Sequence, residues 1–254
     1  MGMQDFSGKV VVVTGASRGL GLACAEAFAA RGAELVLISR GAEELERVAA
    51  RLRAGGAHAV AIPCDVTDPA QVAAAFAGLA RCDVLVNNAG GNRPQPFLEV
   101  SLENLDHLLG LNLRSAFVTA QAAARLMARP GPDGRPAGGV VVNMSSQMGH
   151  VGAPNRSVYC MTKHGIEGLT KAMAVELAPL GIRVVSVAPT YIETPMTRPF
   201  FEDPAFRADT LARIPLGRIG QVHEVASTVV FLASADAGLV TGTSLLVDGG
   251  YTAR

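Results

Sequence analysis

The chain has 254 residues, a length typical of one α/β domain rather than of two small ones. Hydrophobic residues make up 49% of the chain and charged residues 17%, and the mean hydropathy is +0.30, which indicates a large buried core and argues against a disordered chain. Lys plus Arg and Asp plus Glu each total 22, so the formal charge is zero and lacks the basic excess expected of a nucleic-acid-binding protein.

The sequence predicts a protein of the reducing cytoplasm. No stretch reaches the roughly 18 consecutive apolar residues of a membrane-spanning helix, and the opening MGMQDFSGKVVVVTG has no signal-peptide pattern. The cysteines have no C-x-x-C spacing, which is typical of free thiols: Cys24, Cys64, Cys82 and Cys160. The five histidines are scattered. We therefore expect neither a metal site nor a membrane partner.

Strands and helices are expected to alternate along almost the whole chain. Continuous apolar or β-branched runs predict strands at 9–13, 34–38, 57–62, 83–86, 140–144 and 183–187. Helical spacing predicts helices over 42–52, 102–127 and 157–178, and one after the first strand through Leu20, Ala23, Cys24, Ala27 and Phe28. Asp68 followed by Pro69 has the form of a helix N-cap with proline at the first helical position.

This alternation indicates the fold class. Strands that are apolar on both faces and separated by helices predict a parallel sheet covered on both sides. No linker or repeat divides the chain, so residues 1–254 are expected to form one domain. The Pro- and Gly-rich stretch 130–139 predicts a surface loop. From about 190 to 218 the periodicity is lost, and we expect a mobile flap over a site there.

A glycine-rich turn joins the first strand to the first helix. It reads TGASRGLG over residues 14–21, with glycines at Gly15, Gly19 and Gly21. Glycines let backbone N–H groups approach a pyrophosphate, and the helix N-terminus adds partial positive charge. The spacing G-x-x-x-G-x-G differs from the standard G-x-G-x-x-G fingerprint, and such a cluster alone also fits plain turn chemistry. Its place on the first strand–turn–helix unit favours dinucleotide binding.

The end of the second strand is expected to recognise the adenosine ribose. An acid there holds the 2′-hydroxyl of NAD(H), whereas an arginine accommodates the 2′-phosphate of NADP(H). Here the strand ends Ser39-Arg40, the next acid is Glu43, and Arg18 supplies a second cation. The sequence therefore favours NADP(H), with NAD(H) possible if both arginines are only solvated surface.

A serine, a tyrosine and a lysine form a candidate acid–base group. Ser145 and Ser146 follow the fifth strand, where parallel sheets build their sites. Tyr159 and Lys163 lie four residues apart, so they share a helix face; the spacing alone also fits a tyrosine packed beside a surface lysine. A fixed ammonium favours the phenolate of a tyrosine, whose pKa is otherwise near 10. Asn112 lies on an apolar helical stripe, either as a structural amide or holding a water that leads to Lys163.

Together these motifs resemble the short-chain dehydrogenase/reductase family over essentially the whole chain: TGASRGLG, Asn87-Asn88-Ala89-Gly90, Asn112, Ser146, Tyr159 with Lys163, and Val247-Asp248-Gly249-Gly250. The resemblance implies a doubly wound, Rossmann-like sheet of seven parallel strands in the order 3-2-1-4-5-6-7, and a homotetramer. It implies that Tyr159 is the acid–base, that Lys163 holds the nicotinamide ribose and lowers the tyrosine pKa, and that Asn112 holds a proton-relay water. Ser146, thirteen residues before Tyr159, matches the family serine better than Ser145.

The resemblance also assigns cofactor contacts. It places Asp65 and Val66 at the adenine, Asn88 at the ribose side, and Ile192 and Thr194 at the carboxamide. With the glycine-rich turn, the expected cofactor-binding set is Gly15, Ser17, Arg18, Gly19, Leu20, Gly21, Arg40, Asp65, Val66, Asn88, Gly90, Tyr159, Lys163, Ile192 and Thr194.

Two positions depart from patterns within the family. Relatives usually read Pro-Gly after strand six, whereas this chain has Pro189-Thr190, which changes the backbone expected at the nicotinamide end. Val175 stands where carrier-protein reductases tend to have a basic residue, although Arg125 and Arg129 remain. Polyol and sugar-acid dehydrogenases therefore match at least as well.

The predicted function is that of an NAD(P)-dependent oxidoreductase. It would interconvert a ketone and a secondary alcohol by hydride transfer, on a small sugar, polyol, hydroxy-acid or 3-oxoacyl substrate. The alternative is a nucleotide-sensing or scaffold protein that has kept the fold and lost the chemistry. The intact set of Ser146, Tyr159, Lys163 and Asn112 favours the enzyme, because a sensor needs only the glycine-rich half. His150 either reaches the substrate or lies on the surface.

Overall fold

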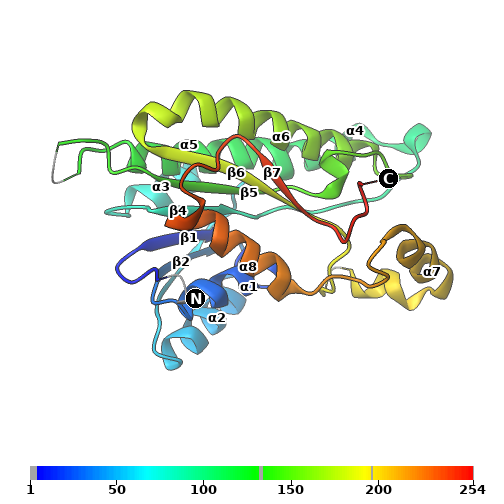
Figure 1. Cartoon of the computed structure of the whole chain (residues 1–254), viewed down its shortest axis with the longest axis horizontal. Coiled ribbons are helices and arrows are strands. Elements are labelled where there is room, and N and C mark those ends of the chain that lie inside the picture. The colour runs from blue at the N-terminus through cyan, green and yellow to red at the C-terminus, as the bar shows by residue number, and fades with distance from the viewer. Residues whose placement is uncertain (1–4, 132–133, 196, 254) are drawn as a thin grey trace.

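One parallel sheet runs through the part of the chain described by the computed structural model, residues 5–131, 134–195 and 197–253 (Figure 1). Its order, β3-β2-β1-β4-β5-β6-β7, is the one that the resemblance implied. The strands are β1 (Val10–Thr14), β2 (Glu34–Ser39), β3 (His58–Pro63), β4 (Val84–Asn87), β5 (Gly139–Met144), β6 (Ile182–Pro189) and β7 (Ser244–Val247). The six strands predicted from apolar runs are confirmed, and each observed end lies within two residues of its predicted position.

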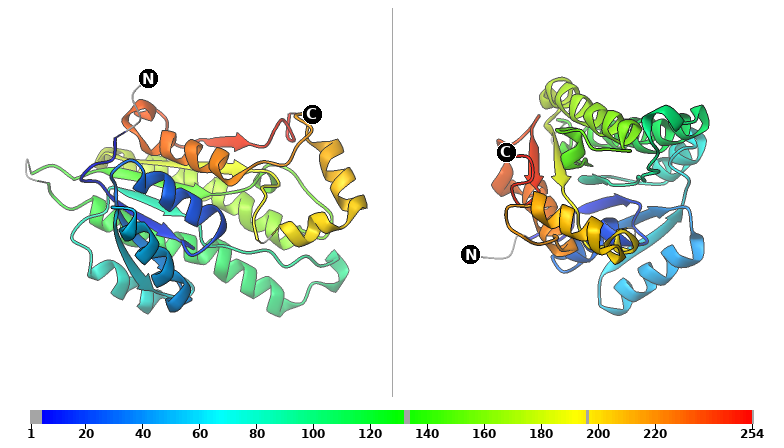
Figure 2. Two further views of the ribbon diagram at one scale, coloured as in Figure 1. Left: turned by 90° about the horizontal axis from the view of Figure 1, so that it is seen from below. Right: turned by 90° about the vertical axis from the view of Figure 1, so that its right-hand side faces the viewer.

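Helices cover both faces of the sheet (Figures 1 and 2). One layer holds α1 (Gly19–Ala29), α2 (Ala42–Ala54) and α8 (Val222–Ala233), and the other holds α3 (Pro69–Ala77), α4 (Leu102–Leu108), α5 (Ser115–Met127) and α6 (Ser157–Leu177). Alternate residues of β1 serve the two cores: Val11 and Val13 pack on the α1 and α8 side, and Val12 on the α3 and α5 side. All three are fully buried, as expected for a central parallel strand.

Local signals explain where several helices begin. The Asp68 carboxylate accepts a hydrogen bond of 2.8 Å from the Ala70 N–H, and Pro69 is the first residue of α3, so the predicted N-cap is confirmed. Asp203 caps α7 (Pro204–Arg213) in the same way, through a 2.9 Å bond from the Ala205 N–H.

The helix predicted without a break over 102–127 is interrupted, so that prediction was wrong in its middle. Between α4 and α5 the chain makes a π-helical turn, Leu109–Arg114. A π turn holds one residue more than an α turn and often occurs at functional sites. Asn112 lies within it and is buried. Apolar spacing does not reveal a single inserted residue.

The segment 190–218 is more regular than its sequence predicted. It holds a 3-10 helix, Arg198–Glu202, followed by α7, which lies outside both layers beyond the carboxyl end of β6 (Figure 1). Most α7 residues are exposed, and only Thr210 is buried. The helix therefore has no apolar stripe that periodicity could detect. Met196 lies outside the described residues. The mobility expected of this segment remains a prediction.

Candidate functional site

A cleft of about 640 Å³ follows the carboxyl ends of the strands. Its volume falls within the usual range for small-molecule sites. Most of the predicted site residues line it: Gly15, Ser17, Arg18, Gly19, Leu20, Arg40, Val66, Asn88, Gly90, Ser146, Tyr159, Lys163, Ile192 and Thr194. Three predicted residues do not line it: Gly21, Asp65 and Asn112. Sequence reasoning missed other lining residues, among them Glu44, Cys64, Leu111, Met144 and Thr197.

The glycine-rich turn is shaped by close backbone approach. Gly15 and Gly19 have φ angles of +64° and +58°, which disfavour a side chain. A Cβ added to Gly21 would lie 2.2 Å from the Gly15 carbonyl oxygen, so Gly21 supports the turn from behind. Asn88, at the end of β4, donates from its side-chain amide to the Thr14 carbonyl oxygen at 2.9 Å. The turn is thus fixed from both sides, with its backbone facing the cleft.

One end of the cleft carries positive charge. Arg18 and Arg40 line it there, and both side chains are exposed. The Ser39 hydroxyl beside them is buried and has no hydrogen-bond partner among the residues described. Glu44 also lines this end and brings a carboxylate. The end therefore combines two cations, an unsatisfied hydroxyl and one anion.

Asp65 and Asn112 lie behind the cleft wall and organise loops. The Asp65 carboxylate accepts from the Thr67 N–H at 2.9 Å and from its hydroxyl at 2.8 Å. The Asn112 amide donates to the Gly91 carbonyl at 2.9 Å and to the Thr162 hydroxyl at 3.2 Å, and its oxygen accepts from the Gly91 N–H at 2.8 Å. Asn112 therefore joins the loop after β4 to α6. Its expected part in holding a water remains a prediction.

Ser146, Tyr159 and Lys163 meet at the other end of the cleft. Ser146 is buried, its hydroxyl donates to the Gln147 side-chain oxygen at 3.0 Å, and it lies close enough to Tyr159 to lower the pKa of that phenol. The Lys163 ammonium donates to the Met144 carbonyl at 2.7 Å and lies 5.6 Å from the Tyr159 ring centroid. The Ser145 hydroxyl is buried without a partner in the described parts of the chain. Both serines line the cleft, so the choice of Ser146 over Ser145 remains a prediction.

Burial controls the protonation of the tyrosine and the lysine. Burial raises the pKa of Tyr159 above its ordinary value, and the hydrogen bond from Ser146 and the charge of Arg156 only partly oppose that rise. Burial lowers the pKa of Lys163 to about 8, against the opposing charge of Glu167. In the protein alone, Tyr159 is therefore a neutral proton donor at pH 7 and Lys163 is mainly an ammonium.

Glu167, which sequence reasoning missed, is a buried carboxylate one helical turn beyond Lys163. It accepts hydrogen bonds from the hydroxyls of Ser186 at 2.7 Å and Ser244 at 3.2 Å. The His150 Nε2 atom lies 3.4 Å from the same carboxylate and 3.1 Å from the Ser244 hydroxyl. His150 therefore faces β7 and not the cleft. The four-residue spacing from Lys163 was the available signal for Glu167.

After β6, this chain has the Thr190 hydroxyl where the family resemblance implies a glycine. The Thr190 N–H donates to the Val247 carbonyl at 3.1 Å, which fixes the backbone. The Thr190 hydroxyl is buried, and within the described residues it has no partner. The next residue, Tyr191, packs edge-on against Phe201, Phe206 and Tyr251, with ring centroids 6.0, 5.7 and 6.5 Å away. This aromatic cluster joins the segment after β6 to the last residues of the chain.

Other features bear on metals, membranes and redox state. Over residues 5–131, 134–195 and 197–253, no group of three or more His, Cys, Asp or Glu side chains is placed to hold a metal ion. In the same ranges, no helix has both the length and the apolar composition needed to cross a bilayer. All four cysteines are free thiols, and Cys160 is the one that is partly exposed.

The chain matches known proteins over nearly its full length. A family model described as enoyl-(acyl carrier protein) reductase matches residues 15–252. A D-threitol dehydrogenase of Mycolicibacterium smegmatis is 39% identical, with 98% of this chain and 96% of the relative covered. An L-xylulose reductase of Bos taurus is 40% identical, with 98% of each covered.

Solved structures are also similar to this chain over nearly its full length. A short-chain type dehydrogenase/reductase of Mycobacterium marinum superposes with a TM-score of 0.92 at 39% identity, covering 99% of this chain and 98% of that one. A gluconate 5-dehydrogenase of Burkholderia cenocepacia, in complex with NADP and tartrate, has a TM-score of 0.92 at 36% identity, covering 98% and 97%.

Proposed function

This chain belongs to the short-chain dehydrogenase/reductase family and is an oxidoreductase acting on alcohol and ketone groups, and we propose that Ser146, Tyr159 and Lys163 carry its proton chemistry. The observation that supports this assignment is their convergence at one end of the cleft, where Ser146 lies close enough to Tyr159 to lower the pKa of the phenol. The relatives named above are dehydrogenases and reductases, so they lend no support to an inactive nucleotide sensor.

The residues present fit a nicotinamide dinucleotide. The turn at Gly15, Gly19 and Gly21 leaves room for a pyrophosphate at the start of α1, because side chains are excluded there. Asn88 and Gly90 line the middle of the cleft, and Ile192 and Thr194 line it after β6. Gly21, Asp65 and Asn112 serve this site from behind its wall. Bound there, the cofactor supplies or accepts the hydride.

We assign NADP(H) as the preferred form, because Arg18, Arg40 and the unsatisfied hydroxyl of Ser39 lie at one end of the cleft. A 2′-phosphate would gain charge-assisted hydrogen bonds from both guanidiniums. Several similar structures, including the Burkholderia enzyme, hold NADP. NAD(H) remains the weaker cofactor, with Glu44 as an acceptor for its 2′-hydroxyl.

The proton moves between Tyr159 and the oxygen of the substrate. During reduction, the neutral phenol of Tyr159 donates its proton to the carbonyl oxygen as that oxygen gains negative charge. The Ser146 hydroxyl hydrogen-bonds the same oxygen and stabilises this charge. The ammonium of Lys163 lies beside the tyrosine ring and favours the phenolate left behind. During oxidation of the alcohol, the phenolate takes the proton back.

Exposed apolar side chains support assembly into a homotetramer. Phe117 on α5 is 51% exposed, and Met161 and Val175 on α6 are 46% and 78% exposed. Leu245 and Leu246 on the edge strand β7 are 39% and 40% exposed. The exposed apolar residues of α5 and α6 are suited to one two-fold interface, and those of the edge strand β7 are suited to a second one. The free thiols suit the reducing cytoplasm, where we place the protein.

The test of the assignment is Tyr159→Phe. The variant removes only the hydroxyl, so the fold and cofactor affinity should persist while kcat falls by about 10²–10⁴-fold. Absorbance of the reduced nicotinamide would be followed with ketoacids, sugars, polyols and 3-oxoacyl thioesters. Retention of more than about a tenth of wild-type kcat, with a substrate that the wild type accepts, would overturn the role given to Tyr159.

A further inference from the structure

Three charged side chains are buried in the described part of the chain: Lys163, Glu167 and Asp248. The Asp248 carboxylate accepts from the Gly250 N–H at 3.0 Å and from the Thr252 N–H at 2.9 Å, so it stabilises a turn near the end of the chain. Lys163 and Glu167 are 5% and 7% exposed and lie four residues apart, on one face of α6. Charged side chains are rarely buried unless an opposite charge lies near them. Glu167 is the buried anion placed to balance Lys163.

Both oxygens of the Glu167 carboxylate are held in place. The Oε2 atom accepts from the Ser186 hydroxyl on β6 at 2.7 Å, and the Oε1 atom accepts from the Ser244 hydroxyl on β7 at 3.2 Å. The Nε2 atom of His150, at the end of the turn that follows β5, lies 3.4 Å from Oε1. An ionised carboxylate is an acceptor at both oxygens. These contacts therefore fix a negative charge between α6 and the sheet, one helical turn from Lys163.

Two further cations belong to the elements that pack around Glu167. Lys171 lies one turn beyond it on α6 and is exposed to solvent. Arg183 on β6 donates to the Ser234 carbonyl at 3.0 Å, which directs its charge toward the segment after α8. Lys163 is thus the buried cation on which the charge of Glu167 acts.

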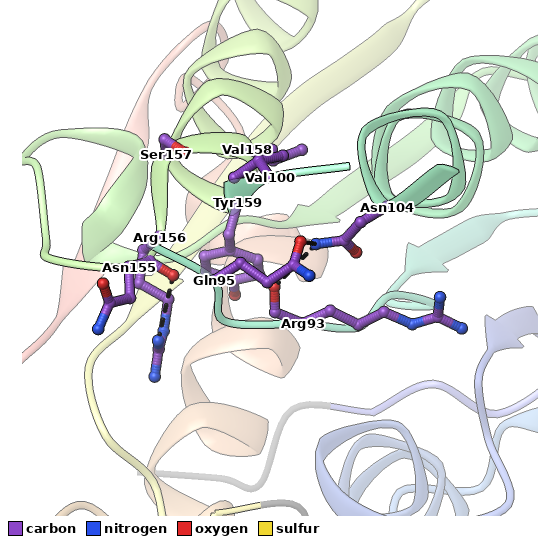
Figure 3. A pocket seen from close by; sticks show the side chains of 9 residues that line it. All are labelled: Arg93, Gln95, Val100, Asn104, Asn155, Arg156, Ser157, Val158 and Tyr159. Carbon is purple, nitrogen blue, oxygen red and sulfur yellow. Dashed lines mark hydrogen bonds between the residues drawn. The ribbon is translucent and has the colours of Figure 1, made fainter. Parts of the chain in front are cut away.

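Neighbouring charges reach Tyr159 and Lys163 from different sides. Figure 3 shows Arg156 and Tyr159 at the start of α6, among nine side chains that pack without space for a water molecule between them. The charge of Arg156 lowers the pKa of the Tyr159 phenol, whereas the charge of Glu167 raises the pKa of Lys163 against the effect of burial. Glu167 therefore influences the phenolate through the ammonium beside it.

We propose that Glu167 is a positioning residue that keeps Lys163 in its ammonium form, and that it acts through its charge rather than by anchoring α6 to the sheet. The proposal rests on the proton chemistry proposed for Tyr159 and Lys163. Residues four apart on a helix have Cβ atoms about 5–6 Å apart. At that distance, loss of the opposite charge lowers the pKa of a buried lysine by about one pH unit or more. With a pKa of about 8, Lys163 is half charged at pH 8, and without Glu167 about a tenth of it would stay charged.

The experiment compares Glu167→Gln with the wild type at two pH values, with NADP(H) and a polyol, sugar or hydroxy acid that the wild type turns over. Glutamine keeps the length of the side chain and an acceptor for Ser186 but removes the charge. At pH 8, kcat for alcohol oxidation should fall about fivefold or more. At pH 6 Lys163 is protonated in both proteins, so ketone reduction should stay within about twofold of the wild-type rate. Loss of an anchor would lower both rates.

Matched variants separate charge from anchoring. Ser186→Ala removes the shorter hydrogen bond to Glu167 but keeps the carboxylate, so oxidation at pH 8 should match the wild type. Glu176→Gln removes a carboxylate from the exposed side of α6 and should have no effect. His150→Gln should leave the pH 8 defect of Glu167→Gln in place, which separates the titration of Lys163 from that of the imidazole. Glu167→Met, uncharged and of similar length, gives the same prediction if the glutamine variant does not fold.

Unfolding by denaturant gives a readout that needs neither cofactor nor substrate. The pKa of Lys163 is about 8 in the folded protein and 10.5 ordinarily, so its contribution to the free energy of unfolding rises with pH between those values. In Glu167→Gln this rise should begin about one pH unit lower. In the double variant with Lys163→Ala it should be absent.

The proposal fails if Glu167→Gln keeps the wild-type rates at both pH values while Lys163→Ala does not, or if Ser186→Ala reproduces the defect of Glu167→Gln. In either case the role of Lys163 would stand. If Lys163→Ala itself kept the wild-type pH profile, the proton chemistry proposed for Lys163 would be wrong, and the role of Glu167 with it.

Discussion

We predict that substitution of a single residue, Arg40, reverses the proposed preference for NADP(H). In the wild type, the 2′-phosphate of NADP(H) would meet Arg18 and Arg40, both of which are exposed at the cleft end. Replacing Arg40 by aspartate removes one cation, adds a repulsive charge and offers an acceptor to the 2′-hydroxyl of NAD(H). We therefore expect Arg40→Asp to prefer NAD(H).

The size of the effect follows from the exposure of the two arginines. A hydrogen bond to a charged group is typically worth about 1.5–3 kcal/mol, and solvent lowers this to about 1 kcal/mol for each exposed guanidinium. The wild type should then favour NADP(H) by about 2 kcal/mol, or roughly thirtyfold in kcat/KM. Arg40→Asp removes one cation, adds a repulsive charge and provides an acceptor, each worth about 1 kcal/mol. The free-energy difference between the two cofactors should therefore shift by about 3 kcal/mol towards NAD(H), which leaves a roughly fivefold preference for NAD(H) in kcat/KM.

Steady-state kinetics with both cofactors, together with calorimetric Kd values, measure this shift. Arg47→Asp is the matched control, since Arg47 is exposed on α2, does not line the cleft and carries the same charge. Raising the salt concentration should weaken the wild-type preference, because the arginines are solvated. Equal efficiencies in the wild type, or a preference for NAD(H), would refute the reading of Arg18 and Arg40.

Four further outcomes are expected. Lys163→Ala should weaken cofactor binding and move the optimum for alcohol oxidation to higher pH in a pH–rate profile, because the Tyr159 phenolate loses its neighbouring ammonium; an unchanged profile and Kd would contradict this. Since Lys163 has a folded-state pKa of about 8, below its ordinary 10.5, the unfolded chain binds the additional proton between those values. The contribution of Lys163 to the free energy of unfolding should rise over that pH window and vanish in the alanine variant, as denaturant titrations would show. Gly21→Ala should abolish cofactor binding, because its Cβ would lie 2.2 Å from the Gly15 oxygen; calorimetry showing wild-type affinity would rule that out. Light scattering at micromolar concentration should give the mass of a tetramer, and a monomer would refute the assembly.

Much of the fold could be predicted from the sequence, because central parallel strands are continuous apolar runs. The limits are physical. β7 is an edge strand whose described residues are half-buried or exposed, so it has no such run, and the seventh strand was expected only from the family resemblance. The π turn inserts one residue into a helical pattern. α7 is exposed on most sides and has no stripe.

The site divides in a similar way. The residues within the glycine-rich turn lie close together in sequence, and so do Tyr159 and Lys163. Spacing and residue type were therefore sufficient to predict each of these groups. Arg156 and Asn104 come from separate segments, and only the folded chain packs them beside Tyr159. Glu167 was missed because its partners Ser186 and Ser244 lie on two later strands. Sequence patterns indicate which residues are neighbours within one helix or strand, but not which residues of different helices and strands come into contact.

The Glu167 carboxylate also connects the edge of the sheet with the charge of Lys163. It accepts from Ser244 on β7, and its field acts on Lys163 one turn away along α6. If a second subunit docks on Leu245 and Leu246 and displaces β7, the hydrogen bonding of that carboxylate changes, and so does the proton affinity of the lysine. Coupling of this kind is reciprocal. Assembly through this edge would take up or release a fraction of a proton, and the affinity between subunits would then depend on pH.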